Sequence, residues 1–214
     1  MDQNYDMKKV VDNIRALGID MINEAKSGHP GIVLGASPII TTLYMNHMKI
    51  NTKDDKWLNR DRFVMSAGHG SALLYSTLFM AGFDIPFEEL KRFRKIDSIT
   101  PGHPEVGVTP GVDVSTGPLG EGFATSVGIA LSERFLRDYF GSDVFNYYTY
   151  VLCGDGDLME GVSYEAASLA GTLNLNKLIV LYDSNNVTLD GNLNISFSED
   201  IKKRFEASYM RWLL

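Results

Sequence analysis

Cysteine is almost absent from this sequence, which contains a single one, Cys153. A disulfide within the chain is therefore impossible, and the lack of cysteine pairs or short ligand pairs argues against a zinc site. Long apolar runs are also missing, and the first residues, MDQNYDMKK, lack the apolar core of a signal peptide. These absences lead us to expect a cytoplasmic protein with no membrane partner.

An excess of positive charge is missing as well. The 27 acidic and 20 basic residues give a net charge of −7, whereas a nucleic-acid partner needs basic surface that displaces counterions. No nucleic-acid partner is therefore expected. Hydrophobic residues make up 44% of the 214 positions, which is enough for a sizeable core in one domain or a large fragment of one.

The first half of the chain has the hydrophobic spacing of helices. Helices are predicted over residues 7–26, 37–47, 71–81 and 86–94, with a short strand over residues 60–66. Residues 99–120 are rich in Pro, Gly and Thr and show little periodicity. A loop of that length in a compact chain is usually functional.

The second half alternates between helix and strand. Helices are predicted over residues 121–140 and 164–173, and strands over residues 148–153 and 177–182. A strand, a helix and a second strand form a unit in which the two strands are parallel and the crossover is right-handed. We therefore predict the α/β class, with a parallel sheet flanked by helices.

Polar turns follow both strands of this unit. Gly154-Asp155-Gly156 follows the first strand, and Asp183-Ser184-Asn185-Asn186 follows the second. Open α/β sheets bind ligands at the carboxyl ends of their strands, and Mg²⁺ prefers oxygen ligands that it shares with phosphates. Asp155, Asn185 and the main-chain carbonyl of Val187 are thus candidate metal ligands, with Gly156 allowing close approach of a diphosphate. Each turn alone is more often a plain acidic or Asx turn.

Three of the four histidines lie in loops rich in glycine and proline: His29 in SGHPG, His69 in GHGS and His103 in TPGHPE. Such loops hold an imidazole exposed, where it can donate hydrogen bonds or transfer protons near neutral pH. A single loop histidine is usually just solvent-exposed, but three in matching contexts predict a shared polar pocket.

The glycine-rich segment STGPLGEG, residues 115–122, precedes the helix predicted over residues 121–140. Glycines at a helix N-terminus can present main-chain N–H groups to a phosphate. The order of the glycines differs from the dinucleotide fingerprint, and no clear strand precedes them. An NAD-binding α/β protein therefore remains only as a weaker alternative.

Taken in order, these motifs resemble the N-terminal, thiamine diphosphate-binding domain of transketolase. The resemblance runs from about Asn13 to Ala207 and rests on SGHPG, RDRFVMSAGHGS, TPGHPEVG, STGPLGEG, GDGDLMEG and YDSNNVTLDG. It implies transfer of a two-carbon ketol unit from a ketose phosphate to an aldose phosphate, with thiamine diphosphate and Mg²⁺ as cofactors. Sugar phosphates would be the substrates, and a homodimer or a complementing C-terminal transketolase chain would be the partner.

The resemblance also implies roles for single residues. Asp155, Asn185 and the Val187 carbonyl would bind the metal. His29 and His103 would face the sugar. The cofactor contacts would be His69, Gly117, Pro118, Leu119, Gly156 and Asn185.

The sequence departs from the family pattern in three places. Asn192 stands where the family often has histidine, and Ser98-Ile99 replace a more basic stretch. After Ala207 the pattern breaks off, so we expect residues 1–214 to be a truncated single domain that lacks two later domains and the family's cofactor-activating glutamate. The alternative function is a catalytically inactive remnant or interaction module that retains the fold.

Overall fold

Helices make up most of the first of two compact units, which contains the residues up to Trp57 together with His69–Ser115. The computed structural model describes residues 6–188 and 191–211. This unit holds α1 (Met7–Ala25), α2 (Pro30–Thr42), a π-helical turn (Leu43–His47), α3 (Ser71–Ala81) and α4 (Phe87–Lys91), and a 3₁₀ turn (Gly68–Gly70) begins at its edge. The assignment of residues 1–214 to one domain stays a prediction.

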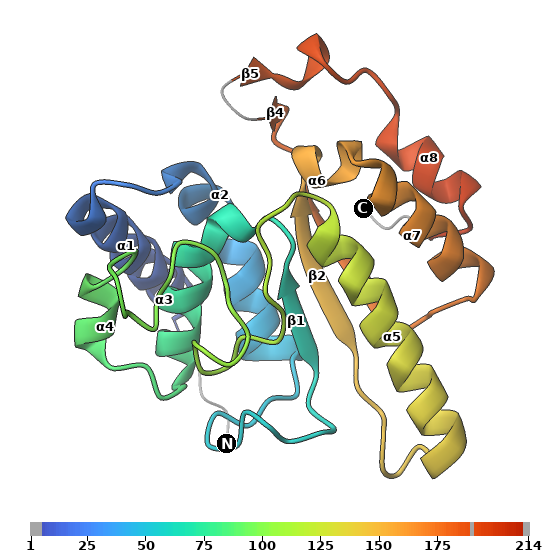
Figure 1. The fold of residues 1–214 in the computed structure, drawn as a ribbon, viewed down its shortest axis with the longest axis horizontal. Helices are drawn as coiled ribbons and strands as arrows, with labels where there is room; N and C mark the ends of the chain where they lie inside the picture. The colour runs from blue at the N-terminus through green and yellow to red at the C-terminus, as the bar shows by residue number, and fades with distance from the viewer. Residues whose placement is uncertain (1–5, 189–190, 212–214) are drawn as a thin grey trace. The chain divides into compact units, whose positions relative to one another are not determined.

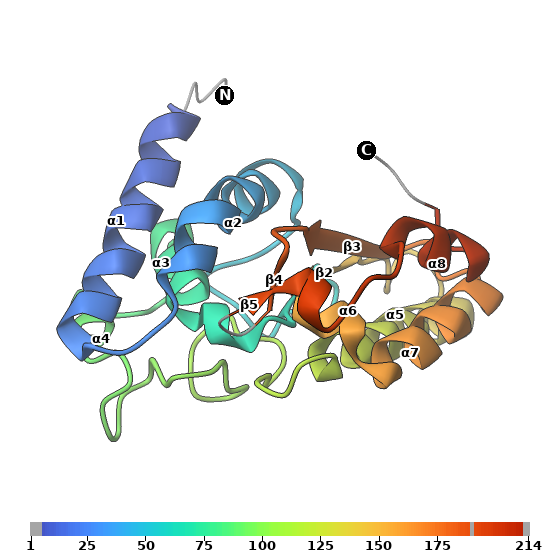
Figure 2. The ribbon, with the colours of Figure 1, turned by 90° about the horizontal axis from the view of Figure 1, so that it is seen from above.

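Helix α1 follows the predicted spacing closely. Its N-terminus is capped by Asp6, whose carboxylate accepts the Lys9 N–H at 3.3 Å, and it ends at Lys26 in the left-handed conformation. The apolar face of α1 buries Ile14 and Met21, and the helix lies beside α2 and α3 (Figures 1 and 2). Burial of this stripe explains why the periodicity predicted the helix correctly.

Helix α2 begins earlier than the sequence predicted, at Pro30 instead of Ser37. Proline is well suited to the first turn of a helix, so the HPG motif opens the helix where a loop was expected. Pro38 then falls inside the helix and cannot donate a hydrogen bond to the Leu34 carbonyl. That carbonyl instead accepts a hydrogen bond from the Arg15 side chain of α1 at 3.0 Å. A tertiary contact thus replaces the missing helical bond.

The parallel sheet belongs to the second unit, which contains Leu58–Gly68 and the residues from Thr116 onward. Its strands are β1 (Arg62–Met65), β2 (Thr149–Gly154) and β3 (Leu178–Asp183), in the order β1-β2-β3. Both pairings are parallel, which confirms the predicted strand–helix–strand unit. The register pairs Met65 with Leu152 and Gly154 with Asp183, so all three carboxyl ends lie at one edge.

Helices pack on this sheet and complete the α/β arrangement. Helix α5 (Glu121–Phe140) contacts all three strands, and α7 (Gly161–Thr172) runs beside α5 (Figure 1). The buried Phe123 ring meets Phe205 of α8 (Ile201–Ala207) edge-on at a centroid distance of 5.9 Å. None of the described helices combines the length and apolar character that crossing a bilayer requires.

Two local features of this unit differ from the prediction. A short helix, α6 (Asp155–Met159), occupies the turn after β2, and α7 begins at Gly161 instead of Tyr164. Beyond β3, a small antiparallel pair joins β4 (Val187–Thr188) to β5 (Gly191–Asn192), followed by a 3₁₀ turn (Leu193–Ile195). Strand β4 lies against α6 beyond the carboxyl ends of the strands (Figure 1).

Candidate functional site at the carboxyl edge of the sheet

Asp155 is the centre of the candidate site in the second unit. This residue is only 2% exposed although it directly follows the end of β2. One carboxylate oxygen accepts the main-chain N–H groups of Asn185 at 3.1 Å and Asn186 at 2.7 Å, and the other accepts the Tyr182 hydroxyl. The two polar turns that the sequence singled out are therefore joined directly by this carboxylate.

Asn185 folds back on its own turn. Its side-chain oxygen accepts the Val187 N–H at 2.9 Å, and its amide nitrogen donates to Asp183 at 3.1 Å. This is an Asx turn, which is the plain structural role that the sequence also allows for Asn185. Asn186 adopts a positive φ of 60°, which turns the chain sharply toward β4. In this arrangement Asn185 orders the loop, and its oxygen already holds one hydrogen bond.

The oxygen donors of this edge suit a hard cation. A carboxylate offers about four lone-pair positions, and three of those on Asp155 are used by the turn and Tyr182. The Asn185 amide oxygen and the Val187 carbonyl are of the type that Mg²⁺ accepts. Among residues 6–188 and 191–211, no group of three His, Cys, Asp or Glu side chains is placed to hold a metal. Magnesium would therefore need amide, main-chain and phosphate oxygens besides the Asp155 carboxylate, and the ligand set of Asp155, Asn185 and Val187 stays a prediction.

The glycine-rich loop lies against this edge. Thr116 donates to the Met65 carbonyl at 2.8 Å, and a Cβ on Gly68 would approach the Gly117 nitrogen to 2.9 Å. A Cβ on Gly156 would come within 3.1 Å of the Leu119 side chain, so these two predicted cofactor contacts are neighbours. Pro118, which lies between Gly117 and Leu119 in the loop, is exposed.

The first N–H groups of α5 are used within the chain. Glu121 donates to the Pro118 carbonyl at 3.3 Å, and Phe123 donates to the Ser66 hydroxyl at 2.9 Å. These bonds hold the glycine-rich loop in place. The sequence suggested that N–H groups at this helix N-terminus could bind a phosphate. In this structure the N–H groups of Glu121 and Phe123 instead form hydrogen bonds within the chain.

The three loop histidines belong to the first unit. His29 is the N-cap of α2 and His69 lies in the 3₁₀ turn, and their ring centroids are 4.9 Å apart. His103 is exposed, and its carbonyl accepts the Tyr75 hydroxyl at 3.1 Å. The imidazole charge of His103 lowers the pKa of His29. The structure thus brings the three motifs together within one unit.

The pKa of His29 is lowered from the usual 6.5, mainly by partial desolvation and further by the charges of Arg94 and His103. We expect His29 to be neutral at pH 7 and to take up its proton at a lower pH than a free histidine. As pH falls, the unfolded chain binds this proton before the folded chain does. The contribution of His29 to the free energy of unfolding is therefore present above pH 6.5 and is lost as pH falls through the lowered pKa. An NMR titration of the imidazole measures the pKa.

The Arg94→Gln variant provides the direct comparison, because it removes one of the charges that lower this pKa. The His29 pKa should rise in Arg94→Gln. It should stay unchanged in Arg92→Gln, whose parent guanidinium is paired with Glu89 at 2.7 Å. An equal response to both substitutions would contradict the assignment.

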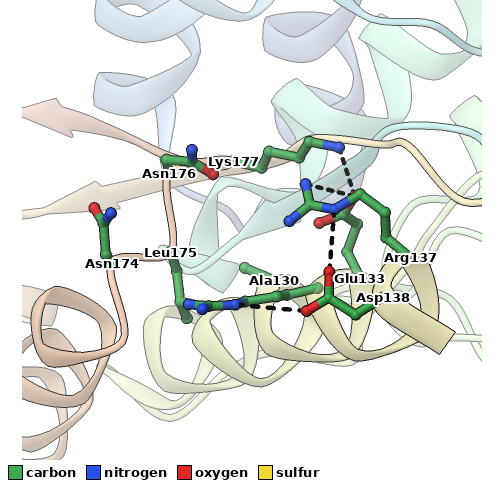
Figure 3. Close-up of a pocket in the computed structure, with 9 residues that line it drawn as sticks. Ala130, Glu133, Arg137, Asp138, Asn174, Leu175, Asn176 and Lys177 are labelled. Atoms are coloured by element: carbon green, nitrogen blue, oxygen red, sulfur yellow. Dashed lines mark hydrogen bonds and ion pairs between the residues drawn. The ribbon is translucent and has the colours of Figure 1, made fainter. Parts of the chain in front are cut away.

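A cavity of about 200 Å³ lies elsewhere in the second unit, between α5 and the turn before β3 (Figure 3). The buried Glu133 carboxylate pairs there with Lys177 at 2.5 Å and Arg137 at 3.5 Å. Lys177 directly precedes β3, so this cavity is at the amino end of the sheet, opposite to Asp155. Because this cavity lies at the opposite end of the sheet from Asp155 and the polar turns, it is not the candidate site.

Sequence reasoning missed two residues that organise the site, Tyr182 and Asp157. Tyr182 is the last-but-one residue of β3, and a tyrosine at that position looks like an ordinary strand residue in the sequence. Burial raises the pKa of the Tyr182 hydroxyl. Asp157 is 1% exposed and is the second acid of GDGDLMEG. An acid three positions after a helix N-cap is a capping signal, and it could have been found had α6 been predicted.

Comparison with known proteins shows which family this chain is similar to. Residues 6–213 match the family described as transketolase, thiamine diphosphate binding domain. The transketolase of Bacillus subtilis (strain 168) is 58% identical over 208 residues, which cover 96% of this chain and 31% of that protein. The transketolase of Aquifex aeolicus is 58% identical over 201 residues, which cover 92% of this chain and 29% of that protein.

A solved structure of transketolase from Leishmania mexicana superposes with a TM-score of 0.93 at 49% identity, covering 95% of this chain and 31% of that one. A Pichia stipitis transketolase solved in complex with sedoheptulose-7-phosphate gives a TM-score of 0.91 at 47% identity, over 95% and 30% of the two chains. The chain thus spans about three tenths of the length of its relatives. The ordered motifs, the parallel sheet and these matches together show that the chain belongs to the transketolase thiamine diphosphate-binding domain family.

Proposed function

We propose that this chain binds thiamine diphosphate together with Mg²⁺ at the carboxyl edge of its sheet, as part of a transketolase-type transferase. Asp155, the Asn185 side chain and the Val187 carbonyl would hold the metal. The cofactor would be contacted by His69, Gly117, Pro118, Leu119, Gly156 and Asn185. Family membership supports the thiamine cofactor and leaves the NAD alternative without support.

The observation that carries the proposal is the environment of Asp155. Asp155 is 2% exposed, and it forms no ion pair with a Lys, Arg or His side chain in the part of the chain that the structure describes. A carboxylate buried in this way is costly. Main-chain N–H groups and the Tyr182 hydroxyl offset part of that cost, and a divalent cation would offset more. The same hydrogen bonds bring the Asn185 turn next to Asp155, so the proposed ligands come from two adjacent turns.

When bound, thiamine diphosphate supplies the electron sink for breaking and forming a carbon–carbon bond next to a carbonyl. The residues of this chain would orient the cofactor and handle protons. His29 and His103 would face the sugar phosphate, and a neutral His29 can accept a proton or a hydrogen bond from a sugar hydroxyl. The reaction we propose is transfer of a two-carbon ketol unit from a ketose phosphate to an aldose phosphate.

Ketol transfer is proposed for an assembly larger than this chain, since the relatives named transketolase are about three times as long. We propose a homodimer, or a complex with a chain that carries the C-terminal part of a transketolase, and a cytoplasmic location. Mixing this chain with such a C-terminal chain should produce ketol transfer that neither chain shows alone.

Calorimetry of the 214-residue chain tests the cofactor proposal. We expect thiamine diphosphate to bind in the presence of Mg²⁺ and to lose most of its affinity when EDTA removes the metal, because the diphosphate and the Asp155 carboxylate repel each other without a cation between them. Thiamine without its diphosphate should bind weakly with or without Mg²⁺. The proposal is wrong if thiamine diphosphate fails to bind or binds equally well in EDTA.

Failure of that experiment would favour the alternative function. A chain that folds as described but does not bind thiamine diphosphate would be an inactive remnant or interaction module. The distinction requires a check of folding by circular dichroism on the same sample, since an unfolded chain also fails to bind.

A further inference from the structure

Asp157 connects three segments of the second unit through one buried carboxylate. One of its oxygens accepts the Ser66 hydroxyl at 2.7 Å and the Gly120 N–H at 3.0 Å. The other accepts the Gly154 N–H at 3.0 Å. These three donors come from the end of β1, the end of the glycine-rich loop and the end of β2. With 1% exposure, Asp157 has little access to water that could replace them.

The connections extend one step further on both sides. The Ser66 hydroxyl also accepts the Phe123 N–H at 2.9 Å, which ties in the first turn of α5. The main-chain carbonyl of Asp157 accepts the Ser163 hydroxyl at 2.6 Å, which ties in α7. Hydrogen bonds to an ionised acceptor are roughly twice as strong as neutral ones. A single carboxylate therefore fixes where the glycine-rich loop lies relative to the turn after β2.

The backbone of the loop explains why such an anchor matters. Gly120 has a φ of +81°, a backbone conformation that residues other than glycine rarely adopt. The loop therefore turns sharply just before α5. Leu119 precedes that turn and lies against Gly156. A shift of Gly120 would move Leu119 and its neighbours Pro118 and Gly117 relative to the Asp155 turn.

We propose that Asp157 is the positioning residue of the diphosphate site. It sets the glycine-rich loop, residues 117–120, against the Asp155–Gly156 turn, so that both proposed sides of the site are in register before the cofactor arrives. This inference rests on the proposed function, and it assigns to Asp157 no contact with metal or cofactor. A preorganised site avoids the cost of ordering a loop when the ligand binds.

The test is the Asp157→Asn variant of the full chain, which keeps the size of the side chain but turns one acceptor oxygen into an N–H₂ donor. That donor would face the N–H of Gly120 or of Gly154, so one of the two segments loses its anchor. We expect calorimetry with saturating Mg²⁺ to show thiamine diphosphate binding about 10- to 100-fold weaker, the range found for residues that orient metal ligands from outside.

Glu133→Gln is the matched control. Glu133 is also a carboxylate with 1% exposure in the same unit, but it lies in the cavity at the amino end of the sheet (Figure 3). Loss of the Glu133 charge should lower the midpoint of urea unfolding, as Asp157→Asn should. It should leave the affinity for thiamine diphosphate unchanged. A role of Asp157 in stability alone would give the two variants the same affinity.

A second readout needs no cofactor. In the unaltered chain the amide protons of Gly120 and Gly154 should exchange slowly with solvent, and Asp157→Asn should speed the exchange of at least one of them, whereas Glu133→Gln should not. Should Asp157→Asn fail to fold, Ser66→Ala removes only one of the three donors, and it should weaken thiamine diphosphate binding by less than tenfold.

The outcomes separate the two proposals. If the unaltered chain does not bind thiamine diphosphate, the proposed function fails and this inference fails with it. If the unaltered chain binds and Asp157→Asn or, in its place, Ser66→Ala binds equally well, only the positioning role is overturned.

Discussion

Replacing Asp155 with asparagine should remove Mg²⁺-dependent binding of thiamine diphosphate while leaving the chain folded. The asparagine oxygen can still accept the N–H groups of Asn185 and Asn186, and its amide group can donate to the Tyr182 hydroxyl, so the turn after β3 is retained. What is lost is the negative charge. Removing one member of a buried, hydrogen-bonded charge pair typically costs about 2–5 kcal/mol of binding free energy.

Two further variants sharpen this prediction, which calorimetry with and without Mg²⁺ measures. Asp155→Ala removes both the charge and the acceptors, so it should lose binding and also loosen the Asn185–Asn186 turn. Asp138→Ala removes an exposed carboxylate of α5 at the other end of the unit and should bind like the unaltered chain. If the Asp155→Asn variant keeps its Mg²⁺-dependent affinity for thiamine diphosphate, the Asp155 carboxylate is not the metal ligand.

A second large effect is expected at the amino end of the sheet. Replacing Lys177 with methionine should destabilise the chain by about 3 kcal/mol, because it removes the shorter of the two ion pairs that neutralise the buried Glu133. The Lys177 side chain is 13% exposed and that of Glu133 is 2% exposed, so solvent screens this pair far less than a surface pair. The free energy of unfolding in urea measures the loss.

The double variant Glu133→Leu with Lys177→Met identifies the cause. If the damage comes from an uncompensated buried charge, removing both charges should restore most of the stability, since buried ion pairs replaced by apolar side chains are often no less stable. If the double variant is as unstable as Lys177→Met alone, packing of the lysine stem is responsible. Thiamine diphosphate affinity should be unchanged in either variant that folds.

The parts of this fold that could be predicted are those in which local sequence and burial agree. Helix α5 was predicted with its observed bounds because Gly120 and Gly141 flank an uninterrupted helical stretch. The strands β2 and β3 were predicted within about one residue because each is a short apolar run that ends in a polar turn. Two such runs around a helix leave the parallel arrangement as the expected one, and the register confirms it.

The parts that could not be predicted depend on contacts between distant residues. Pro38 indicated the first turn of a helix, but the Arg15 side chain stabilises the carbonyl that proline leaves without a helical partner, so α2 extends back to Pro30. Asp157 carries no sign in the sequence of its bonds to Ser66 and Gly120, which lie 91 and 37 residues away. At the candidate site, the sequence located Asp155 and Asn185, whereas the anchoring of the turns around them required the structure.

The most direct measurement of the central claim is NMR of the isotope-labelled chain with Mn²⁺ in place of Mg²⁺. A bound paramagnetic ion broadens only the signals of nearby nuclei. With thiamine diphosphate present, we predict selective broadening of the amide signals of Gly156, Asn185 and Val187, with those of Lys177 and Asp138 at the far end of the sheet unaffected. The Asp155→Asn variant should show none of this broadening. Broadening that is confined to exposed carboxylates elsewhere, or that survives in Asp155→Asn, would contradict a metal–diphosphate site at this edge.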